Sequence, residues 1–171
     1  MNLHPFFIRQ LTTYASYHRH PRNRGTHFIG IPAIVFAILC AVALWHPRVL
    51  GLPVSGAWVV GVVAFLGWLA LDVGIGLAML AMLVPMILAA NWIVASGGLV
   101  AAWAVFAIFF VFGWIFQIVG HMWEGKRPAL LDNLFQAFIG PMFIVAEILI
   151  MLGLRPDLRA AVEPVGITHR R

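Results

Sequence analysis

The sequence predicts an all-α protein, a polytopic membrane helix bundle of about four to five transmembrane segments with an N-terminal interfacial helix. Hydrophobic residues make up 63% of the chain and charged residues only 10%, with a mean hydropathy of +0.97; in soluble domains about 25% of residues are charged. Five apolar segments approach the roughly 20 residues that cross a bilayer as a helix. The single cysteine, Cys40, lies inside one of them, which excludes a disulfide framework or a cysteine metal site within one chain.

The 171 residues are expected to form one integral membrane domain in three parts. Residues 1–27 form an interfacial segment that carries a metal motif, residues 28–153 form the membrane helices, and residues 154–171 form a basic tail.

The interfacial helix is predicted from the spacing of its apolar residues. Phe7, Leu11, Tyr14 and His18 fall on one helical face, as an amphipathic helix at a membrane surface requires. His18 therefore lies at the inner end of an apolar stripe.

The membrane segments follow in order, at Phe28–Trp45, Ala57–Val73, Ile75–Ala95, Leu99–Gly120 and Leu134–Leu152. Only residues 72–76 separate the second from the third, which predicts a tight hairpin or a kinked pair. Ser96-Gly97-Gly98 divides the third from the fourth. Pro85 and Pro141 lie inside the third and fifth segments, where proline kinks or breaks a helix.

Basic residues gather before the first segment, after the fourth and after the fifth (Arg9, Arg19, Arg22, Arg24; Lys126, Arg127; Arg155, Arg159, Arg170, Arg171). Positive loops stay cytoplasmic and four crossings return the chain to its starting face, so we expect the first two groups on the cytoplasmic side of a bacterial inner membrane. A fifth full crossing would export the last group. Either Leu134–Leu152 dips and returns around Gly140–Pro141, or the charge rule fails here; the return is the favoured interpretation. The net charge of +5 is compatible with binding to nucleic acid, but no basic residue lies within the apolar segments, so anionic lipid headgroups are the favoured partner.

Histidines at the two cytoplasmic positions predict a metal site. His18 and His27 are nine residues apart, so a single straight helix would aim them in opposite directions. His20-Pro21 supplies a break, and Asn23 is a good N-cap for a new helix that begins near Arg24. Two helices that meet at an angle can then point both imidazoles at one centre.

A second cluster, His121 and Glu124, stands three residues apart on one helical face. Three imidazoles with an optional carboxylate suit Fe(II), Zn or Mn. His20 is either a fourth ligand or a solvated residue before Pro21, and the second interpretation is favoured. A single histidine at a membrane surface is more often only a polar anchor, and the metal interpretation depends on the three histidines lying at the same face.

Other polar residues have two interpretations each. Asn23, Asp132 and Asn133 are expected to orient the imidazoles by hydrogen bonds to their outer nitrogens. Lys126 and Arg127 either bind a substrate carboxylate or hold their loop inside. Asp72 either acts as an intramembrane carboxylate or caps a hairpin, and Glu147 either does the same or pairs with another span. A small transporter or ion-binding membrane protein, which would rely on Asp72 and Glu147, is the alternative function, and a haem-binding electron carrier is a weaker one.

Two blocks of the chain resemble the 2-hydroxy fatty acid dioxygenase family, a fungal fatty-acid α-oxidation enzyme and its bacterial homologues. The blocks are Tyr17-His18-x-x-Pro21-x-Asn23-x-x-x-His27-x-x-x-x-Pro32, and Gly113-Trp114-Ile115-Phe116-Gln117-x-x-Gly120-His121 with Arg127-Pro128-Ala129-Leu130-Leu131-Asp132-Asn133-Leu134-x-Gln136. The resemblance covers the N-terminal motif and the stretch from about Gly113 to Gly153, while the middle segments match only in hydrophobicity.

The resemblance implies a non-haem iron oxidoreductase. It implies Fe(II)-dependent cleavage of a long-chain 2-hydroxy acid by O2 to CO2 and the acid one carbon shorter, with His18, His27 and His121 needed for iron. The reaction removes four electrons, which O2 reduced to water accepts, and no dinucleotide-binding glycine motif is visible in the sequence. The acyl chain is expected to lie between spans, where each buried CH2 contributes about 0.8 kcal/mol.

Overall fold

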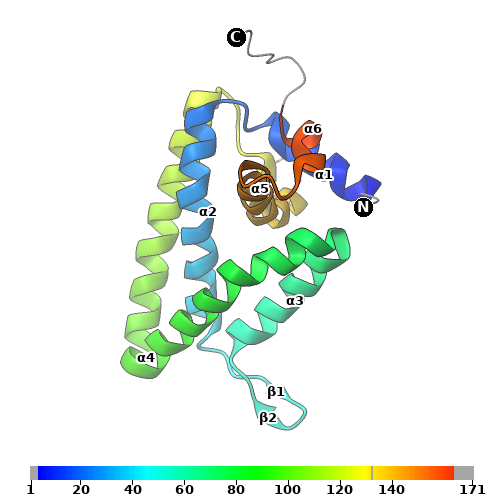
Figure 1. The fold of residues 1–171 in the computed structure, drawn as a ribbon. Coiled ribbons are helices and arrows are strands. Elements are labelled where there is room, and N and C mark those ends of the chain that lie inside the picture. Colours follow the sequence, from blue (N-terminus) through cyan, green and yellow to red (C-terminus); the bar gives the residue numbers. More distant parts are fainter. Residues whose placement is uncertain (1–3, 132, 164–171) are drawn as a thin grey trace.

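The computed structural model describes residues 4–131 and 133–163, which form a helical bundle (Figure 1). Helices α1 (Pro5–Ser16) and α2 (Pro21–Val42) are followed by a short hairpin of β1 (Arg48–Val49) and β2 (Leu52–Pro53), then by α3 (Gly56–Leu71), α4 (Val73–Glu124), the 3-10 turn η1 (Ala129–Leu131), α5 (Phe135–Met151), the 3-10 turn η2 (Pro156–Leu158) and α6 (Arg159–Val162). The all-α class is confirmed, because the only strands in the described chain are these two-residue ones.

Helices α2 and α4 are long and apolar enough to cross a membrane. Helix α3 is a shorter apolar helix, and α5 forms with Pro156–Val162 a pair that bends by 120°. All five predicted segments are therefore helical, and the chain carries membrane-length helices. The number of full crossings stays a prediction.

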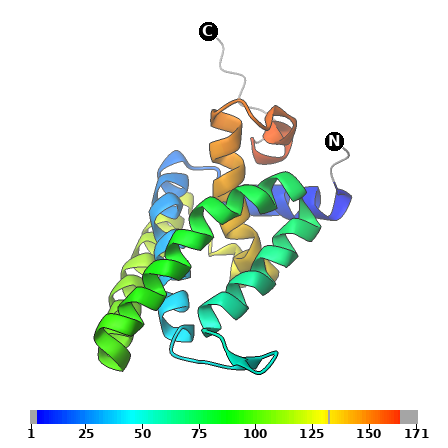
Figure 2. The same ribbon diagram turned by 60° about the horizontal axis from the view of Figure 1, so that its bottom comes forward.

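Gly98 divides α4 into two legs at the place where the sequence predicted a break. Its backbone angles (φ 60°, ψ −151°) are not helical, and they lie in a region that essentially only glycine adopts. The first leg runs back along α3 as a hairpin, and the second runs along α2 (Figures 1 and 2). Pro85, in contrast, lies within a continuous stretch of the first leg.

Glycines allow α2 and the second leg of α4 to approach closely. A Cβ atom on Gly30 would lie 2.8 Å from the carbonyl oxygen of Gly113, and a Cβ on Gly113 would lie 2.8 Å from the carbonyl oxygen of Gly30. Such backbone contact between small residues is typical of helices packed in membranes. It fixes the height of one helix against the other, and with it the alignment of His27 and His121.

The expected return around Gly140–Pro141 is wrong. Helix α5 continues through Pro141, and the chain reverses only after Met151. Proline is tolerated inside membrane helices because neighbouring groups satisfy the freed carbonyl. Helix α5 also lies crosswise to α2, which is seen lengthwise in Figure 1 while α5 is seen nearly end-on.

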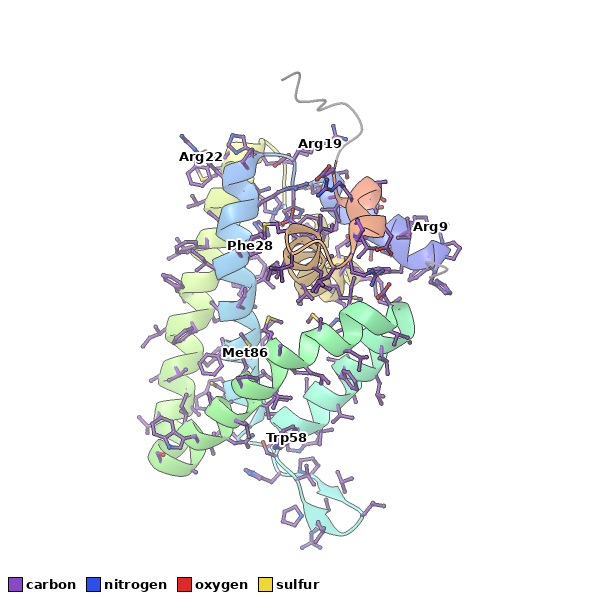
Figure 3. The ribbon with its side chains drawn as sticks, in the orientation of Figure 1. Arg9, Arg19, Arg22, Phe28, Trp58 and Met86 are labelled. Carbon is purple, nitrogen blue, oxygen red and sulfur yellow. The ribbon has the colours of Figure 1, made fainter. Side chains whose placement is uncertain are left out.

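The interfacial helix is built as the spacing predicted. Phe7, Leu11 and Tyr14 are buried on one face of α1, and His18 continues that face beyond the helix end. This face packs against α5 and α6. Figure 3 shows Arg19 and Arg22 together at one end of the molecule, far from Trp58.

Candidate metal centre

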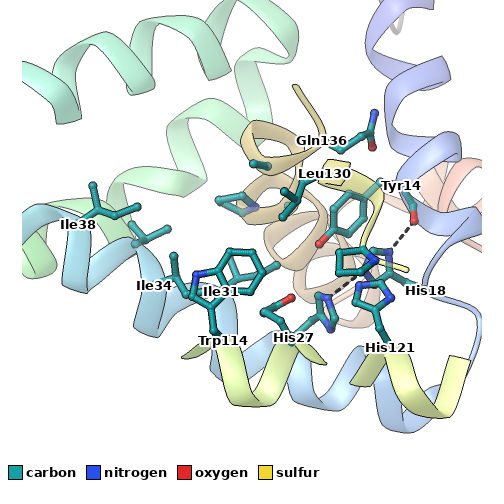
Figure 4. Close-up of a pocket in the computed structure, with 16 residues that line it drawn as sticks. Tyr14, His18, His27, Ile31, Ile34, Ile38, Trp114, His121, Leu130 and Gln136 are labelled. Carbon is teal, nitrogen blue, oxygen red and sulfur yellow. Dashed lines mark hydrogen bonds between the residues drawn. The ribbon is translucent and has the colours of Figure 1, made fainter. Parts of the chain in front are cut away.

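Three buried histidines meet at the basic end of the bundle. His18 lies in the connection between α1 and α2, His27 lies in the first turns of α2, and His121 lies in the last turn of α4. Each offers a ring nitrogen, and these three atoms lie within 4.8 Å of one another. The rings are at most 5% exposed, and Figure 4 shows them converging from separate segments. The structure thus brings together the three histidines that the sequence singled out.

The break between α1 and α2 aims His18 and His27 at each other. Helix α1 ends at Ser16, and α2 begins at Pro21 with His20 as its N-cap, whose ring Nδ1 accepts a hydrogen bond from the Arg22 amide (3.2 Å). The expected N-cap at Asn23 is wrong. Proline fits the first turn of a helix because no partner for its nitrogen is needed there, so α2 begins earlier than predicted.

Hydrogen bonds to backbone carbonyls fix the orientation of two imidazoles. His18 Nδ1 donates to the Tyr14 carbonyl (2.6 Å), and His27 Nδ1 donates to the Asn23 carbonyl (2.8 Å). Because a carbonyl only accepts, the neutral rings carry their protons on Nδ1 and present lone pairs from Nε2. The two Nε2 atoms are 3.0 Å apart.

Two lone pairs at this distance repel each other unless a cation lies between them. Burial, followed by the neighbouring His27 ring, lowers the pKa of His18 to about 2, so protonation does not supply that cation. A metal does: two nitrogens each about 2.0–2.1 Å from one ion are roughly 3.0–3.4 Å apart. His121 offers the third ring nitrogen, within 4.8 Å of the other two ligand atoms, and its Nδ1 is buried without a partner in the described chain; together the three imidazoles make a donor set that fits a metal ion.

Glu124 is engaged away from the three histidines. Its carboxylate accepts hydrogen bonds from the amides of Arg19 (3.0 Å) and His20 (2.7 Å) and from Asn23 Nδ2 (3.1 Å). Glu124 therefore joins the end of α4 to the α1–α2 connection, and His20 caps α2. That either is a metal ligand, the optional part of the sequence prediction, has no geometric support here.

The residues expected to orient the imidazoles differ in position. Asn23 orients His27 through its backbone carbonyl, and its side chain donates to the Tyr17 carbonyl (3.1 Å) as well as to Glu124. Asn133 Oδ1 accepts from the amide of Phe135, the first residue of α5 (3.0 Å), and no hydrogen bond from its side chain to a histidine ring is found among the described residues. Asp132 lies outside the described residues.

Lys126 and Arg127 lie at the surface beside Tyr17, where both line a shallow depression. Lys126 Nζ donates to the Ser16 carbonyl (2.9 Å) and lies 5.7 Å from the centre of the Tyr17 ring. Neither residue lines the cavity that contains the histidines. The hydrogen bond of Lys126 attaches the loop to the end of α1, and both predicted roles of these residues, binding a substrate carboxylate and keeping the loop inside the cell, stay predictions.

Both intramembrane carboxylates have arginine partners. Glu147 pairs with Arg24 (2.6 Å), as one interpretation of the sequence held, and Asp72 caps α4 while accepting both terminal nitrogens of Arg155 (2.8 and 2.9 Å). Arg24 also donates to the carbonyls of His18 and Val162 (2.7 Å each). No functional role for Arg24 was predicted, although a carboxylate inside an apolar segment requires a cation nearby. The two carboxylates on which the transporter alternative relied, Asp72 and Glu147, are therefore both engaged in ion pairs.

An apolar cavity leads away from the histidines. It has about 640 Å³ of empty space, its open mouth included, and Figure 4 shows the histidines at one end and Ile38 at the other. Its lining is mainly apolar (Ile31, Ile34, Val35, Ile38, Trp114, Leu130). Ile38 is 41% exposed, so the far end opens toward the lipid-facing surface.

Three polar residues for which the sequence predicted no part in the site also line this cavity. They are Tyr14, Gln117 and Gln136. Gln117 Nε2 and Gln136 Oε1 are buried without a partner in the described part of the chain. A polar residue inside an apolar segment was the signal that could have found the two glutamines.

Comparison with known proteins gives a consistent result. The family described as "2-hydroxy-palmitic acid dioxygenase Mpo1-like" matches residues 6–152. A protein of Saccharomyces cerevisiae (strain ATCC 204508 / S288c) named 2-hydroxy-palmitic acid dioxygenase MPO1 is 33% identical over 156 residues, which cover 90% of this chain and 86% of the yeast protein. No solved structure matches the chain.

Proposed function

The chain belongs to the Mpo1-like family, and from that premise we propose that it is an Fe(II)-dependent dioxygenase that cleaves long-chain 2-hydroxy fatty acids. The observation that carries the proposal is the buried set of three imidazoles at the closed end of an apolar cavity. A long-chain acid fits such a cavity because its chain is apolar and its head is polar.

In the proposed reaction, a 2-hydroxy acid and O2 give the acid one carbon shorter, CO2 and water. The bond between C1 and C2 breaks, C2 becomes the carboxyl carbon of the product, and the four electrons lost by the substrate reduce O2. A bound Fe(II) would supply the one-electron chemistry through which O2 reacts. His18, His27 and His121 would hold it, as in other sites rich in imidazole.

The protein's own groups prepare this site. The carbonyls of Tyr14 and Asn23 hold two imidazoles in the tautomer that presents Nε2. Glu124 holds the segment that carries His18 against the end of α4. The isoleucines of α2 give the acyl chain an apolar wall, and burial of that chain excludes water from the head of the substrate.

The test is the fate of a carbon label. With Fe(II) and O2, detergent-solubilised protein should release C1 of 2-hydroxypalmitate as CO2 and leave a 15-carbon acid, while palmitate stays unchanged. Label at C1 that remains in the lipid fraction of iron-loaded protein would refute the assignment.

We also propose that the histidine end faces the cytoplasm of a bacterial inner membrane, because basic residues gather there. On a Cys40→Ala background, Arg22→Cys should react with an impermeant maleimide only from the cytoplasm. Leu50→Cys, in the hairpin at the opposite end of α2 (Figure 1), should react only from outside. Reversed labelling would reject this orientation.

A further inference from the structure

The cavity contains polar atoms that the metal centre does not use. Gln136 is 1% exposed and Gln117 is 7% exposed, and each leaves one amide atom without a hydrogen bond among the described residues. Tyr14 is 5% exposed; its ring stacks on that of His18 with the centroids 4.1 Å apart. A buried polar atom without a partner costs free energy, so two such amides beside Tyr14 in one cavity indicate a polar ligand.

The unpaired atom of Gln136 is an acceptor. Its Nε2 donates to Gln10 Oε1 (2.6 Å), which turns Oε1 toward the cavity without a donor. The carboxylate of a fatty acid offers only acceptors at neutral pH. An ionised fatty acid therefore satisfies Gln136 only if it carries a further group with a proton to donate.

The other two residues can supply donors. Gln117 leaves Nε2 unpaired and lies one helical turn before His121 on α4. The hydroxyl of Tyr14 points into the cavity in Figure 4, and it lies near Gly140, where a Cβ atom would be 3.1 Å from it. Both can donate to a carboxylate.

Resting on the proposed function, we propose that Tyr14, Gln117 and Gln136 form the subsite that recognises the head of the substrate. Gln117 and Tyr14 donate to the carboxylate, and Gln136 Oε1 accepts from the 2-hydroxyl. Gln136 is thus the residue that distinguishes a 2-hydroxy acid from a plain fatty acid, independently of the metal. The hydroxyl is thus recognised from α5 and the carboxylate from α1 and α4, while α2 lines the path of the acyl chain.

The first test uses the wild-type, metal-free protein and three acids of equal length. Competition against radiolabelled 2-hydroxypalmitate gives the Kd of 2-hydroxypalmitate, palmitate and 2-fluoropalmitate. Fluorine has nearly the size of a hydroxyl but no proton to donate. We expect 2-hydroxypalmitate to bind about tenfold more tightly than either of the other two, since an unmatched buried acceptor costs about that much. Equal binding of 2-fluoropalmitate and 2-hydroxypalmitate would overturn the proposal.

The second test changes the residue. Gln136→Met keeps the length of the side chain and removes the acceptor, so the ratio of the two Kd values, palmitate to 2-hydroxypalmitate, should fall to about one. Gln117→Met and Tyr14→Phe should weaken both acids and leave the ratio unchanged. Asn91→Leu, an amide replaced outside the cavity whose Nδ2 donates to the Ile87 carbonyl (2.8 Å), is the matched control and should leave both constants unchanged. A tenfold ratio retained by Gln136→Met would reject the assignment.

These outcomes separate the subsite from the reaction. Discrimination by metal-free protein that releases no CO2 when loaded with iron would support the subsite and reject the proposed activity. Conversely, iron-loaded protein that releases CO2, together with metal-free protein that binds 2-hydroxypalmitate and palmitate equally, would support the proposed activity and reject the subsite.

Discussion

Two buried polar clusters in this protein differ in how completely they are satisfied. Around Asp72, the carboxylate accepts from the Ile75 amide and from both terminal nitrogens of Arg155, which also binds Asp157. Around the histidines, two Nε2 atoms face each other at 3.0 Å. The four buried side-chain atoms without partners in residues 4–131 and 133–163 all belong to residues at or beside the histidine cavity (Asn23, Gln117, His121, Gln136).

The difference shows which cluster maintains the fold and which binds something else. A cluster that satisfies itself closes a contact between distant segments, here the α3–α4 turn and the C-terminal turn. A cluster that leaves buried atoms unpaired costs stability unless a ligand completes it. Both carry charged or titratable groups, so composition alone does not separate them. The count of unmet hydrogen bonds does.

The largest expected effect comes from removing an imidazole. His18→Ala, His27→Ala and His121→Ala should each lower CO2 release by about 10³-fold or more, because the loss of a metal is worth several kcal/mol of transition-state stabilisation. Membrane insertion and helix content by circular dichroism should match the wild type. Activity close to that of the wild type in any of the three variants would place the centre elsewhere.

The self-satisfied cluster should show the opposite pattern. Arg155→Met leaves the buried carboxylate of Asp72 without its cation, which typically costs about 3–5 kcal/mol of stability. Thermal unfolding in detergent should therefore occur at a clearly lower temperature. Iron per folded chain should be unchanged. A loss of iron without a loss of stability would remove the distinction between the two clusters.

Glu124→Gln tests the contact between the end of α4, which carries His121, and the α1–α2 connection, which carries His18. It removes the charge that receives the amides of Arg19 and His20. We expect metal affinity to fall about tenfold, in the range found for residues that orient metal ligands, while saturating iron still loads one ion per chain. Failure to load at saturation would instead make Glu124 a ligand.

The smallest effect concerns acid stability. Hydrogen bonds from the Arg155 guanidinium hold the pKa of Asp157, which follows the last membrane segment, below the ordinary 3.8. A pKa that is lower in the folded state gives stability that is present above pH about 4 and lost as the pH falls through the folded value. Thermal unfolding of metal-free protein between pH 5 and pH 2.5 should show this loss. In Arg155→Met the dependence should be weaker, and an equal slope in both proteins would contradict the assignment.

The sequence was sufficient for the local features of the fold. Hydropathy predicted the five helical segments, Ser96-Gly97-Gly98 predicted the break in α4, and the face of Phe7, Leu11 and Tyr14 predicted the interfacial helix. The direction of α5 was not predictable, because proline inside an apolar segment is compatible both with a return and with a continuous helix. Packing against α1, α4 and α2 decides between them.

The candidate site was likewise predictable from the sequence only in part. Histidines at a boundary are rare enough in an apolar chain to be found by inspection, and the break at His20-Pro21 explained how two of them converge. The roles of Arg24, Gln117 and Gln136 depend on partners more than a hundred residues away or on the absence of any partner. Which polar atoms have partners, and which have none, can be seen only in the folded structure.

Metal analysis of protein purified without chelator tests the central claim most directly. The wild type should contain about one iron per chain, and the variant with His18, His27 and His121 all replaced by Ala should contain almost none while Arg155→Met keeps its iron. Stoichiometric iron in the triple variant, or no transition metal in a wild-type protein that releases CO2, would contradict a centre built on these three histidines.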